Sequence, residues 1–291
     1  MMQLLNFKKE IENLVENREG KNMDIKRTAS ALIGFPIVAT ILIFCNKYVV
    51  DITICLIAMI CLYEYFHCFR GEKQTKKLSY ITYISALSIA LLHIIPKEFM
   101  IQILTAIIPV DVLVLFAFVV VTDMKYTIKD ISITLFGICY IVIFLMFIPI
   151  LRECENGRIL IWYAFITAWG TDIFAYLIGK KFGKHKFSKV SPNKSIEGCI
   201  AGTIGAVVLA LIYTVVCNKY LGMNFNYLYI ILISIILSLV GQLGDFSASS
   251  IKRYAGIKDF GNLIPGHGGM LDRIDSVIFI APFAYFLLML L

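Results

Sequence analysis

Long apolar runs, each close to the length needed to cross a lipid bilayer, recur along this 291-residue sequence. Hydrophobic residues make up 59% of the chain and charged residues 16%, whereas soluble domains average roughly 45–50% and about 25%. A globular protein of this size has too little interior to hide such a surplus from water. The sequence therefore argues against a soluble enzyme, a secreted disulfide scaffold and a disordered chain, and it predicts an integral membrane protein.

The apolar runs predict an all-α fold with about nine transmembrane helices, because each span takes about 20 residues. We place the spans at residues 29–45, 49–66, 79–95, 100–121, 131–150, 159–179, 200–217, 227–247 and 274–291. In the arm before them, residues 1–28, apolar residues recur at helical spacing among charges, which is typical of an amphipathic helix on a membrane surface. We therefore divide the chain into this arm, a first transmembrane part (29–150) and a second part (151–291) that carries the polar motifs.

The placement of positive charge predicts how the chain crosses the membrane. Most of the 27 Lys and Arg residues fall in the N-terminal arm and in every second connection. The positive-inside rule puts that side in the cytoplasm, so the N-terminus is expected inside and the C-terminus outside. The formal net charge of +7 is then an orientation signal, and no nucleic-acid partner is expected. With no evident transit segment, we expect a bacterial plasma membrane rather than an organelle.

The first polar region lies at the end of the sixth predicted span and in the connection after it. Asp172 lies roughly eight residues, or ~12 Å along a helix, from the cytoplasmic end of that span. A charge at the bilayer centre costs on the order of 2.5–3.5 kcal/mol, and less near the surface. Asp172 therefore needs a partner cation, a metal ion or a water-filled cavity, and a purely structural ion pair stays open. The following connection carries Ser191, Lys194 and Glu197.

The second polar region runs from Gly241 to Ser276. Asp245 closes the eighth predicted span, and three residues with polar side chains follow at helical offsets of four, seven and eight: Ser249, Lys252 and Arg253. On one helix these offsets place them on or beside the face of Asp245. The region continues with a charged, glycine-rich stretch: Lys258, Asp259, His267, Gly268, Gly269, Asp272, Arg273 and Asp275.

These residue types share one chemistry, the transfer of a phosphoryl or nucleotidyl group. Carboxylates suit a hard divalent cation, glycines let backbone N–H groups approach phosphate oxygens, and cations hold a polyphosphate. In such reactions, positive charge neutralises the transferring phosphorus and the leaving group. Five acidic residues from four spans fall in the predicted cytoplasmic half: Asp172, Glu197, Asp245, Asp272 and Asp275. This placement favours an enzyme that acts on a lipid headgroup and a soluble cosubstrate. Asp272 and Asp275 also fit a simpler interpretation, as helix-start residues favoured by the helix dipole.

The run from Ser249 to Asp275 resembles the signature of phosphatidate cytidylyltransferases, also called CDP-diacylglycerol synthases. The matching elements are Ser249, Lys252-Arg253, Lys258-Asp259, Gly261, Pro265, His267-Gly268-Gly269, Asp272-Arg273 and Asp275. A second motif of that family is similar to the stretch that holds Asp172, Ser191, Lys194 and Glu197. The resemblance implies that CTP and phosphatidic acid react to give CDP-diacylglycerol and pyrophosphate, a step of phospholipid biosynthesis.

The resemblance also implies a role for each site residue. Asp245 and Asp272 would bind Mg²⁺, with a second cation left open, and would be catalytic together with Lys252 and Arg253. The substrate-binding residues would be Ser249, Lys258, Arg273, His267, Gly268, Gly269, Asp172, Ser191, Lys194 and Glu197. Asp259 and Asp275 would support these groups structurally. No strong general base is required, because the attacking phosphate is already an anion. A homodimer in the bilayer is a further implication.

Two other classes of protein stay open. A membrane lipid kinase or another CTP-dependent transferase would share metal and phosphate binding, but would differ in the spacing from His-Gly-Gly to Asp-Arg. A cation-coupled transporter would use Asp172 and Asp111 along a pathway. Asp111 lies near the middle of the fourth predicted span and has no role in the enzyme hypothesis. Transporters more often place such groups near the midplane on broken helices of repeated halves.

Overall fold

The computed structural model describes residues 36–69, 75–96, 99–188, 190–192, 194–263 and 268–290. Within these ranges the chain forms helices and no strand, and one isolated antiparallel bridge joins Lys186 to Ser195. The predicted all-α class is therefore confirmed. The predicted amphipathic arm and His267 lie outside the described residues.

A short helix covers residues 36–44 and precedes the labelled helices. These follow in chain order: α2 (Lys47–Cys68), α3 (Thr75–Leu91), α4 (Met100–Val121), α5 (Ile128–Gly137), the π-helix η2 (Ile138–Ile143), α6 (Phe144–Arg152), α7 (Gly157–Phe182), α8 (Ile196–Tyr220), α9 (Tyr227–Tyr254) and α10 (Leu271–Leu288). The π-helix joins α5 to α6, so the chain runs as one helical rod from Ile128 to Arg152.

Six helical stretches are long and apolar enough to cross a membrane. They are Lys47–Cys68, Gln102–Val121, Ile128–Arg152, Gly157–Phe182, Ile196–Tyr220 and Tyr227–Tyr254. Two further helices fall just short, because α3 has 17 residues and the 18 residues of α10 include Asp272, Arg273 and Asp275. The described residues thus establish a polytopic helical chain, whereas the count of nine spans and the orientation of the termini stay predictions.

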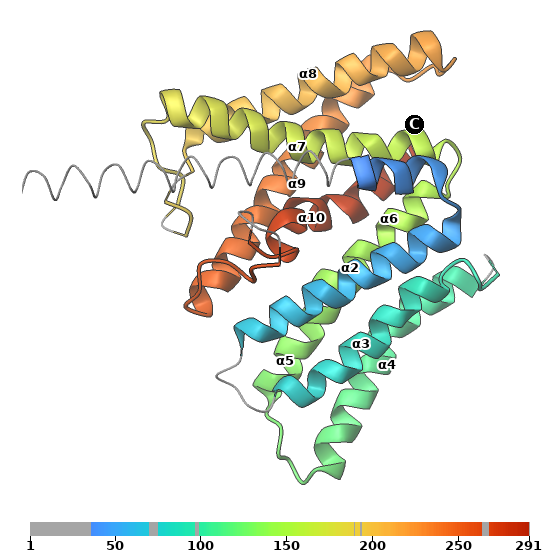
Figure 1. The fold of residues 1–291 in the computed structure, drawn as a ribbon, viewed down its shortest axis with the longest axis vertical. Coiled ribbons are helices and arrows are strands. Elements are labelled where there is room, and N and C mark those ends of the chain that lie inside the picture. The colour runs from blue at the N-terminus through green and yellow to red at the C-terminus, as the bar shows by residue number, and fades with distance from the viewer. Residues whose placement is uncertain are drawn as a thin grey trace, which may run out of the picture.

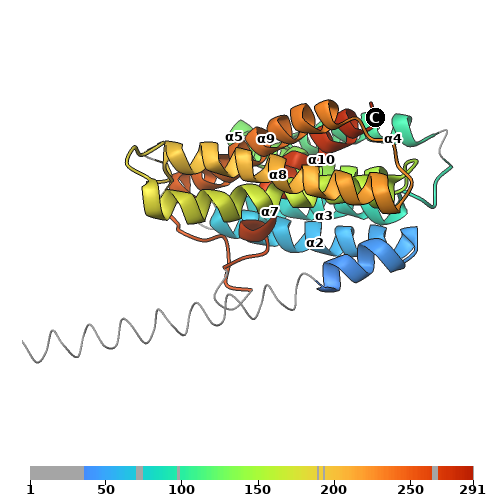
Figure 2. The same ribbon diagram turned by 90° about the horizontal axis from the view of Figure 1, so that it is seen from above.

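The last helix of the chain packs between the others. Figure 1 shows α7 and α8 side by side, α2, α3 and α4 on the opposite side of the bundle, and α9 and α10 between these groups. The same neighbours appear when the bundle is viewed from above in Figure 2. Helix α10 contacts α9, α6, α7 and α2, so it joins the first part of the chain to the last. The division into transmembrane parts at residue 150 is not tested by this packing.

The close packing of α7 on α8 depends on glycines. A Cβ atom at Gly202 would lie 2.7 Å from the carbonyl oxygen of Thr171, and one at Gly205 would lie 2.2 Å from the ring of Phe174. Small residues of this kind let membrane helices approach each other. The Thr171 hydroxyl also hydrogen-bonds to Ser238 of α9 at 2.7 Å. These contacts fix the stretch of α7 that carries Asp172.

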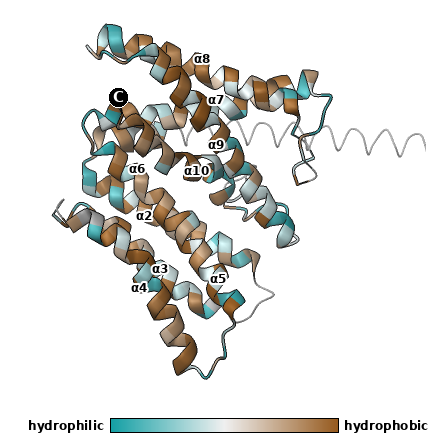
Figure 3. Cartoon of the chain, turned by 180° about the vertical axis from the view of Figure 1, so that it is seen from behind, coloured by the Kyte–Doolittle hydropathy of each residue, from teal (hydrophilic) through white to brown (hydrophobic). Residues whose placement is uncertain are grey.

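Apolar side chains also cover much of the outside of the bundle. Figure 3 shows hydrophobic colouring along most helices, while hydrophilic colouring gathers at helix ends and in the connections. Helix α4 is an extreme case, because Leu113 and Val120 are 69% and 73% exposed on a helix with no charged residue but Asp111. Large exposed apolar faces are unfavourable in water and favourable in lipid. The surface therefore agrees with a membrane protein.

Candidate functional site

A polar cavity of about 680 Å³ lies where α7, α8, α9 and α10 meet. Five carboxylates among the described residues line it: Asp172, Asp245, Asp259, Asp272 and Asp275. Five cationic side chains lie among them: Lys180, Lys186, Lys194, Lys252 and Arg273. Ser191 also lines the cavity. The structure thus brings predicted residues from both polar regions to one cavity, and their individual roles stay predictions.

Helix α9 brings Asp245 and Lys252 to the same cavity, as their spacing predicted. The helix continues to Tyr254, seven residues past the predicted end of the span, so both side chains belong to one helix. Asp245 forms an ion pair with Lys194, which comes from the loop before α8. The Lys194 amine also lies 4.8 Å from the centroid of the Phe246 ring. One ion pair therefore connects the two polar regions of the sequence.

The surroundings of Lys194 act on its charge in opposite directions. Burial lowers the pKa of its amine below the ordinary value, while the carboxylates of Asp172 and Asp275 act to raise it. Because burial has a larger effect on the pKa than these carboxylates, any further negative charge that enters the cavity would stabilise the protonated amine. A bound polyphosphate would bring such charge.

Asp272 holds three separate segments together. Its Oδ1 accepts a hydrogen bond from the Lys252 amine at 2.7 Å. Its Oδ2 accepts the backbone N–H groups of Phe260 at 2.8 Å and Gly269 at 3.0 Å. The Gly269 contact satisfies an N–H group just before α10, so the helix-start interpretation of Asp272 holds as well. Gly268 has a φ of +84°, and a Cβ there would lie 3.1 Å from the same Oδ2.

Several predicted site residues lie outside the lining of this cavity. Arg253 donates to the carbonyl oxygens of Val190 and Ile257, both at 3.4 Å, and thereby braces the loop before α8. Glu197 accepts the Lys184 and His185 backbone N–H groups and pairs with the His185 ring at 2.6 Å. The remaining four are Lys258, which is exposed, half-buried Ser249, Gly268, and Gly269, whose N–H is already donated to Asp272.

Asp172 lines the polar cavity and is exposed. This agrees with one of the alternatives given for it above, in which a water-filled cavity surrounds an acidic side chain within a membrane span. Asp111 lies elsewhere, on α4, where its Oδ1 accepts the Ser85 hydroxyl at 2.7 Å and its Oδ2 is buried with no hydrogen bond from the described residues. The two aspartates that a transporter would use thus do not share the polar cavity.

A buried acid on α2 was missed by the sequence analysis. Glu64 is 4% exposed, and its carboxylate accepts the backbone N–H groups of Met270 at 2.9 Å and Leu271 at 2.8 Å. An acidic residue inside an otherwise apolar predicted span was the signal that could have found it, because such residues are costly in a membrane. Three further polar side chains that line the polar cavity were not predicted as site residues: Lys180, Lys186 and Gln242.

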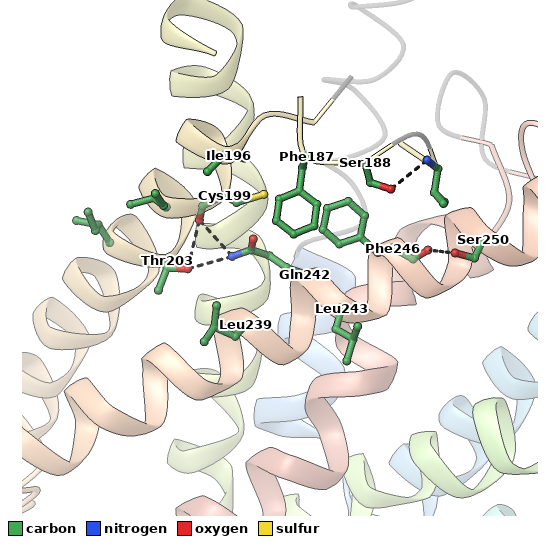
Figure 4. A pocket seen from close by; sticks show the side chains of 13 residues that line it. Phe187, Ser188, Ile196, Cys199, Thr203, Leu239, Gln242, Leu243, Phe246 and Ser250 are labelled. Carbon is green, nitrogen blue, oxygen red and sulfur yellow. Dashed lines mark hydrogen bonds between the residues drawn. The ribbon is translucent and has the colours of Figure 1, made fainter. Parts of the chain in front are cut away.

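An apolar groove of about 600 Å³ lies beside the polar cavity, between α8 and α9 (Figure 4). Its apolar lining consists of Phe187, Val190, Ile196, Ile200, Ile204, Leu239, Leu243 and Phe246. The Phe187 ring stacks on Phe246 with 4.6 Å between centroids. Cys199 and Gln242 line both hollows, and the Gln242 amide donates to Thr203 at 3.0 Å. The groove and the polar cavity are therefore adjacent, with Cys199 and Gln242 at the boundary between them.

The comparison with known families agrees with this arrangement of motifs. A family model described as the cytidylyltransferase family matches residues 25–291. The chain belongs to the cytidylyltransferase family. The resemblance seen in the signature is thereby confirmed, and the match covers all the helices described above.

Curated members of the cytidylyltransferase family carry a more specific name. A phosphatidate cytidylyltransferase of Bacillus subtilis is 42% identical over 181 residues, which are 62% of this chain and 66% of that protein. One of Staphylococcus haemolyticus is 39% identical over 176 residues, 60% of this chain and 65% of the relative. The chain thus spans slightly less than two thirds of the length of these relatives.

The carboxylates fit a magnesium ion that a bound nucleotide would help to coordinate. Within the described ranges, no group of three or more acidic, His or Cys side chains could hold a metal ion by itself. Mg²⁺ commonly takes only one or two carboxylates and fills its shell with substrate phosphates and water. Asp245 and Asp272 line one cavity and satisfy this requirement, with Lys194 and Lys252 as their present partners.

Proposed function

We propose that this chain is a phosphatidate cytidylyltransferase, which forms CDP-diacylglycerol and pyrophosphate from CTP and phosphatidic acid. The position of an apolar groove directly beside a charged cavity carries the proposal, because the two substrates are a water-soluble triphosphate and a lipid. Family membership and the names of the relatives support the same reaction.

In this reaction, an oxygen of the phosphatidate phosphate attacks the α-phosphorus of CTP. One P–O bond forms there, and the bond to the β,γ-diphosphate breaks and releases pyrophosphate. Lys252, Arg273 and Lys194 line the cavity and would bind the phosphates as charge develops on the leaving group. Asp245 and Asp272 would hold Mg²⁺, which supplies charge neutralisation when bound. Since the nucleophile is an anion, these residues act by positioning and electrostatics.

The apolar groove would hold an acyl chain of the lipid. Its members Ile200, Ile204 and Leu243 are 58%, 60% and 56% exposed on the outer surface of α8 and α9, where a lipid could enter sideways. A chain in the groove would leave the phosphate headgroup beside Gln242 and Cys199, at the boundary of the polar cavity. The same arrangement delivers CTP from water and the lipid from the bilayer.

The proposal includes a membrane orientation. Nine spans, with the N-terminus in the cytoplasm and the C-terminus outside, would open the polar cavity to cytoplasmic CTP, in line with the positive-inside rule. The membrane would be a bacterial plasma membrane. The homodimer stays a prediction within this proposal, since the structure contains one chain.

Incubating the purified, folded protein with CTP, phosphatidic acid and Mg²⁺ tests the proposal. We expect the α-phosphate label of CTP to enter the lipid product and the γ-phosphate label to appear in pyrophosphate. Transfer of the γ-phosphate to a lipid would instead identify a kinase. Folded protein that forms no CDP-diacylglycerol would overturn the proposal.

Filling the apolar groove should impair use of long-chain lipid. In Ile200→Trp the indole would displace about two methylene groups of an acyl chain, each worth about 0.8 kcal/mol when buried. We expect the KM for long-chain phosphatidic acid to rise about tenfold, with the KM for CTP unchanged. Steady-state kinetics with long-chain and dihexanoyl phosphatidic acid provide the measurement.

The matched control is Ile212→Trp, on the same helix. Ile212 is 56% exposed, against 58% for Ile200, and does not line the groove. We expect this variant to keep the wild-type KM for both lipids. An equal effect of the two substitutions, or an equal effect of Ile200→Trp on both lipids, would contradict the acyl-chain site.

A further inference from the structure

An acidic side chain of the first transmembrane part hydrogen-bonds to the signature region. Glu64 of α2 lies 206 residues before Met270 in the sequence, yet its Oε1 accepts the Met270 N–H at 2.9 Å. Its Oε2 accepts the Leu271 N–H at 2.8 Å. Both N–H groups belong to the start of α10, where the helix itself provides no acceptors. The carboxylate therefore caps the helix that carries Asp272 and Asp275.

Two glycines of the signature make room for this carboxylate. A Cβ atom at Gly261 would lie 2.7 Å from Oε1 of Glu64, and one at Gly269 would lie 2.5 Å from Oε2. Gly261 directly follows Phe260, and Gly269 lies two residues before the start of α10. A larger residue at either position would displace the Glu64 carboxylate or the backbone. The signature region is thus packed around an acid that the signature does not contain.

The cap also restricts where a phosphate can bind. The free N–H groups at a helix N-terminus form a ready anion site. Here Glu64 occupies two of them, and Asp272 accepts the Gly269 N–H just before them. At this end of α10 a triphosphate would therefore be bound by side chains such as Lys252 and Arg273 rather than by free N–H groups. The placement of Arg273 depends on how the start of α10 is held.

We propose that Glu64 is a positioning residue for the nucleotide site, which sets the start of α10 so that Asp272 and Arg273 face the bound triphosphate and its cation. This inference rests on the proposed function, since it assumes that the polar cavity takes a nucleotide. Glu64 does not line the polar cavity. It acts through the backbone of Met270 and Leu271.

The geometry requires a carboxylate at this position. Both oxygens accept N–H groups, so the amide of a glutamine would place its NH₂ group against one of these donors. A backbone N–H without an acceptor in a buried site is costly. Glu64→Gln therefore keeps the size of the side chain and removes one of the two contacts, which makes it a mild and specific perturbation.

Binding and turnover of Glu64→Gln test the proposal. We expect the Kd for CTP with Mg²⁺, measured by calorimetry on the full chain in detergent, to rise at least about tenfold. In the assay, the Mg²⁺ concentration for half-maximal rate should rise and kcat should fall, while the KM for phosphatidic acid stays within twofold. Gly261→Ala perturbs the same contact from the other side and should reproduce these changes. The double variant should be no worse than the stronger single variant, because both act on one contact.

The matched control is Asp51→Asn on the same helix. Asp51 is also a buried carboxylate that accepts a backbone N–H from another segment, that of His93 at 3.3 Å, and it pairs with the His93 ring at 2.8 Å. It lies 13 residues from Glu64, or ~20 Å along the helix. Thermal unfolding in detergent reports any structural loss in both variants. We expect Asp51→Asn to leave the affinity for CTP and Mg²⁺ unchanged.

The outcomes separate this inference from the proposed function. If Glu64→Gln and Gly261→Ala lose only thermal stability and keep wild-type nucleotide affinity and Mg²⁺ dependence, Glu64 is structural and the inference is wrong. If the wild-type protein binds CTP with Mg²⁺ but forms no CDP-diacylglycerol, the proposed function fails, and the calorimetric comparison of the variants still supports or overturns the positioning role.

Discussion

Replacing Asp245 with asparagine is expected to reduce CDP-diacylglycerol formation about 10²–10³-fold, the size of loss found when one electrostatic contact to a transition state is removed. The substitution keeps the shape of the side chain but removes the charge that would hold Mg²⁺. Stability should change little, because the Asp245 side chain is 23% exposed and its partner Lys194 is 25% exposed. A partly exposed lysine that keeps the nearby carboxylates of Asp172 and Asp275 can lose one partner at small cost.

The measurement for Asp245→Asn is kcat/KM for both substrates, together with thermal unfolding in detergent. Ser247→Ala provides a control on the same helix, since Ser247 is two residues away, lies outside the polar cavity and donates only to the Leu243 carbonyl. It should retain wild-type activity. Wild-type kcat/KM in Asp245→Asn would remove Asp245 from the metal site.

Asp272→Asn is expected to lose both activity and stability. The Asp272 side chain is 2% exposed and the Lys252 side chain 13%, so the substitution leaves a buried ammonium without its hydrogen-bonded carboxylate. Breaking such a pair typically costs about 3–5 kcal/mol. The asparagine amide group must also face one of its donors, Lys252 or the N–H groups of Phe260 and Gly269. We expect Tm to fall by on the order of 10 °C, with activity lost at every temperature.

Comparing the two substitutions distinguishes a structural role of a carboxylate from a role in the reaction. Thermal unfolding should separate Asp272→Asn from Asp245→Asn, although both variants should be inactive when assayed well below Tm. An Asp272→Asn protein with wild-type Tm would contradict the structural role that its hydrogen bonds assign to it. Recovery of full activity at low temperature would contradict its role in the reaction.

The fold class followed from patterns that act locally. Apolar length and the distribution of charge are properties of consecutive residues, and every described helix from α2 to α10 overlaps a predicted span. The ends of these helices were harder to predict. Helix α9 continues past the apolar segment to Tyr254. Helix α10 begins at Leu271, where Asp272 and Glu64 cap its start.

The site was predictable where its residues share a helix. Asp245 and Lys252 follow the helical repeat, and both line the polar cavity. The ion pair of Asp245 with Lys194 could not be read from the sequence, because 51 residues separate the two and only helix packing brings them together. For the same reason, the bracing contact of Arg253 with Val190 and the turn held by Glu197 were not foreseen.

Local sequence was thus sufficient to predict a helical membrane protein, its charged motifs and the chemistry that they share. Such properties depend on the spacing of neighbouring residues and on the cost of placing charge in lipid. The packing of distant helices was needed to place the polar cavity beside the apolar groove and to place Glu64 of α2 against the start of α10. These contacts arise from shape and hydrogen bonding between segments up to 207 residues apart, which no local pattern encodes.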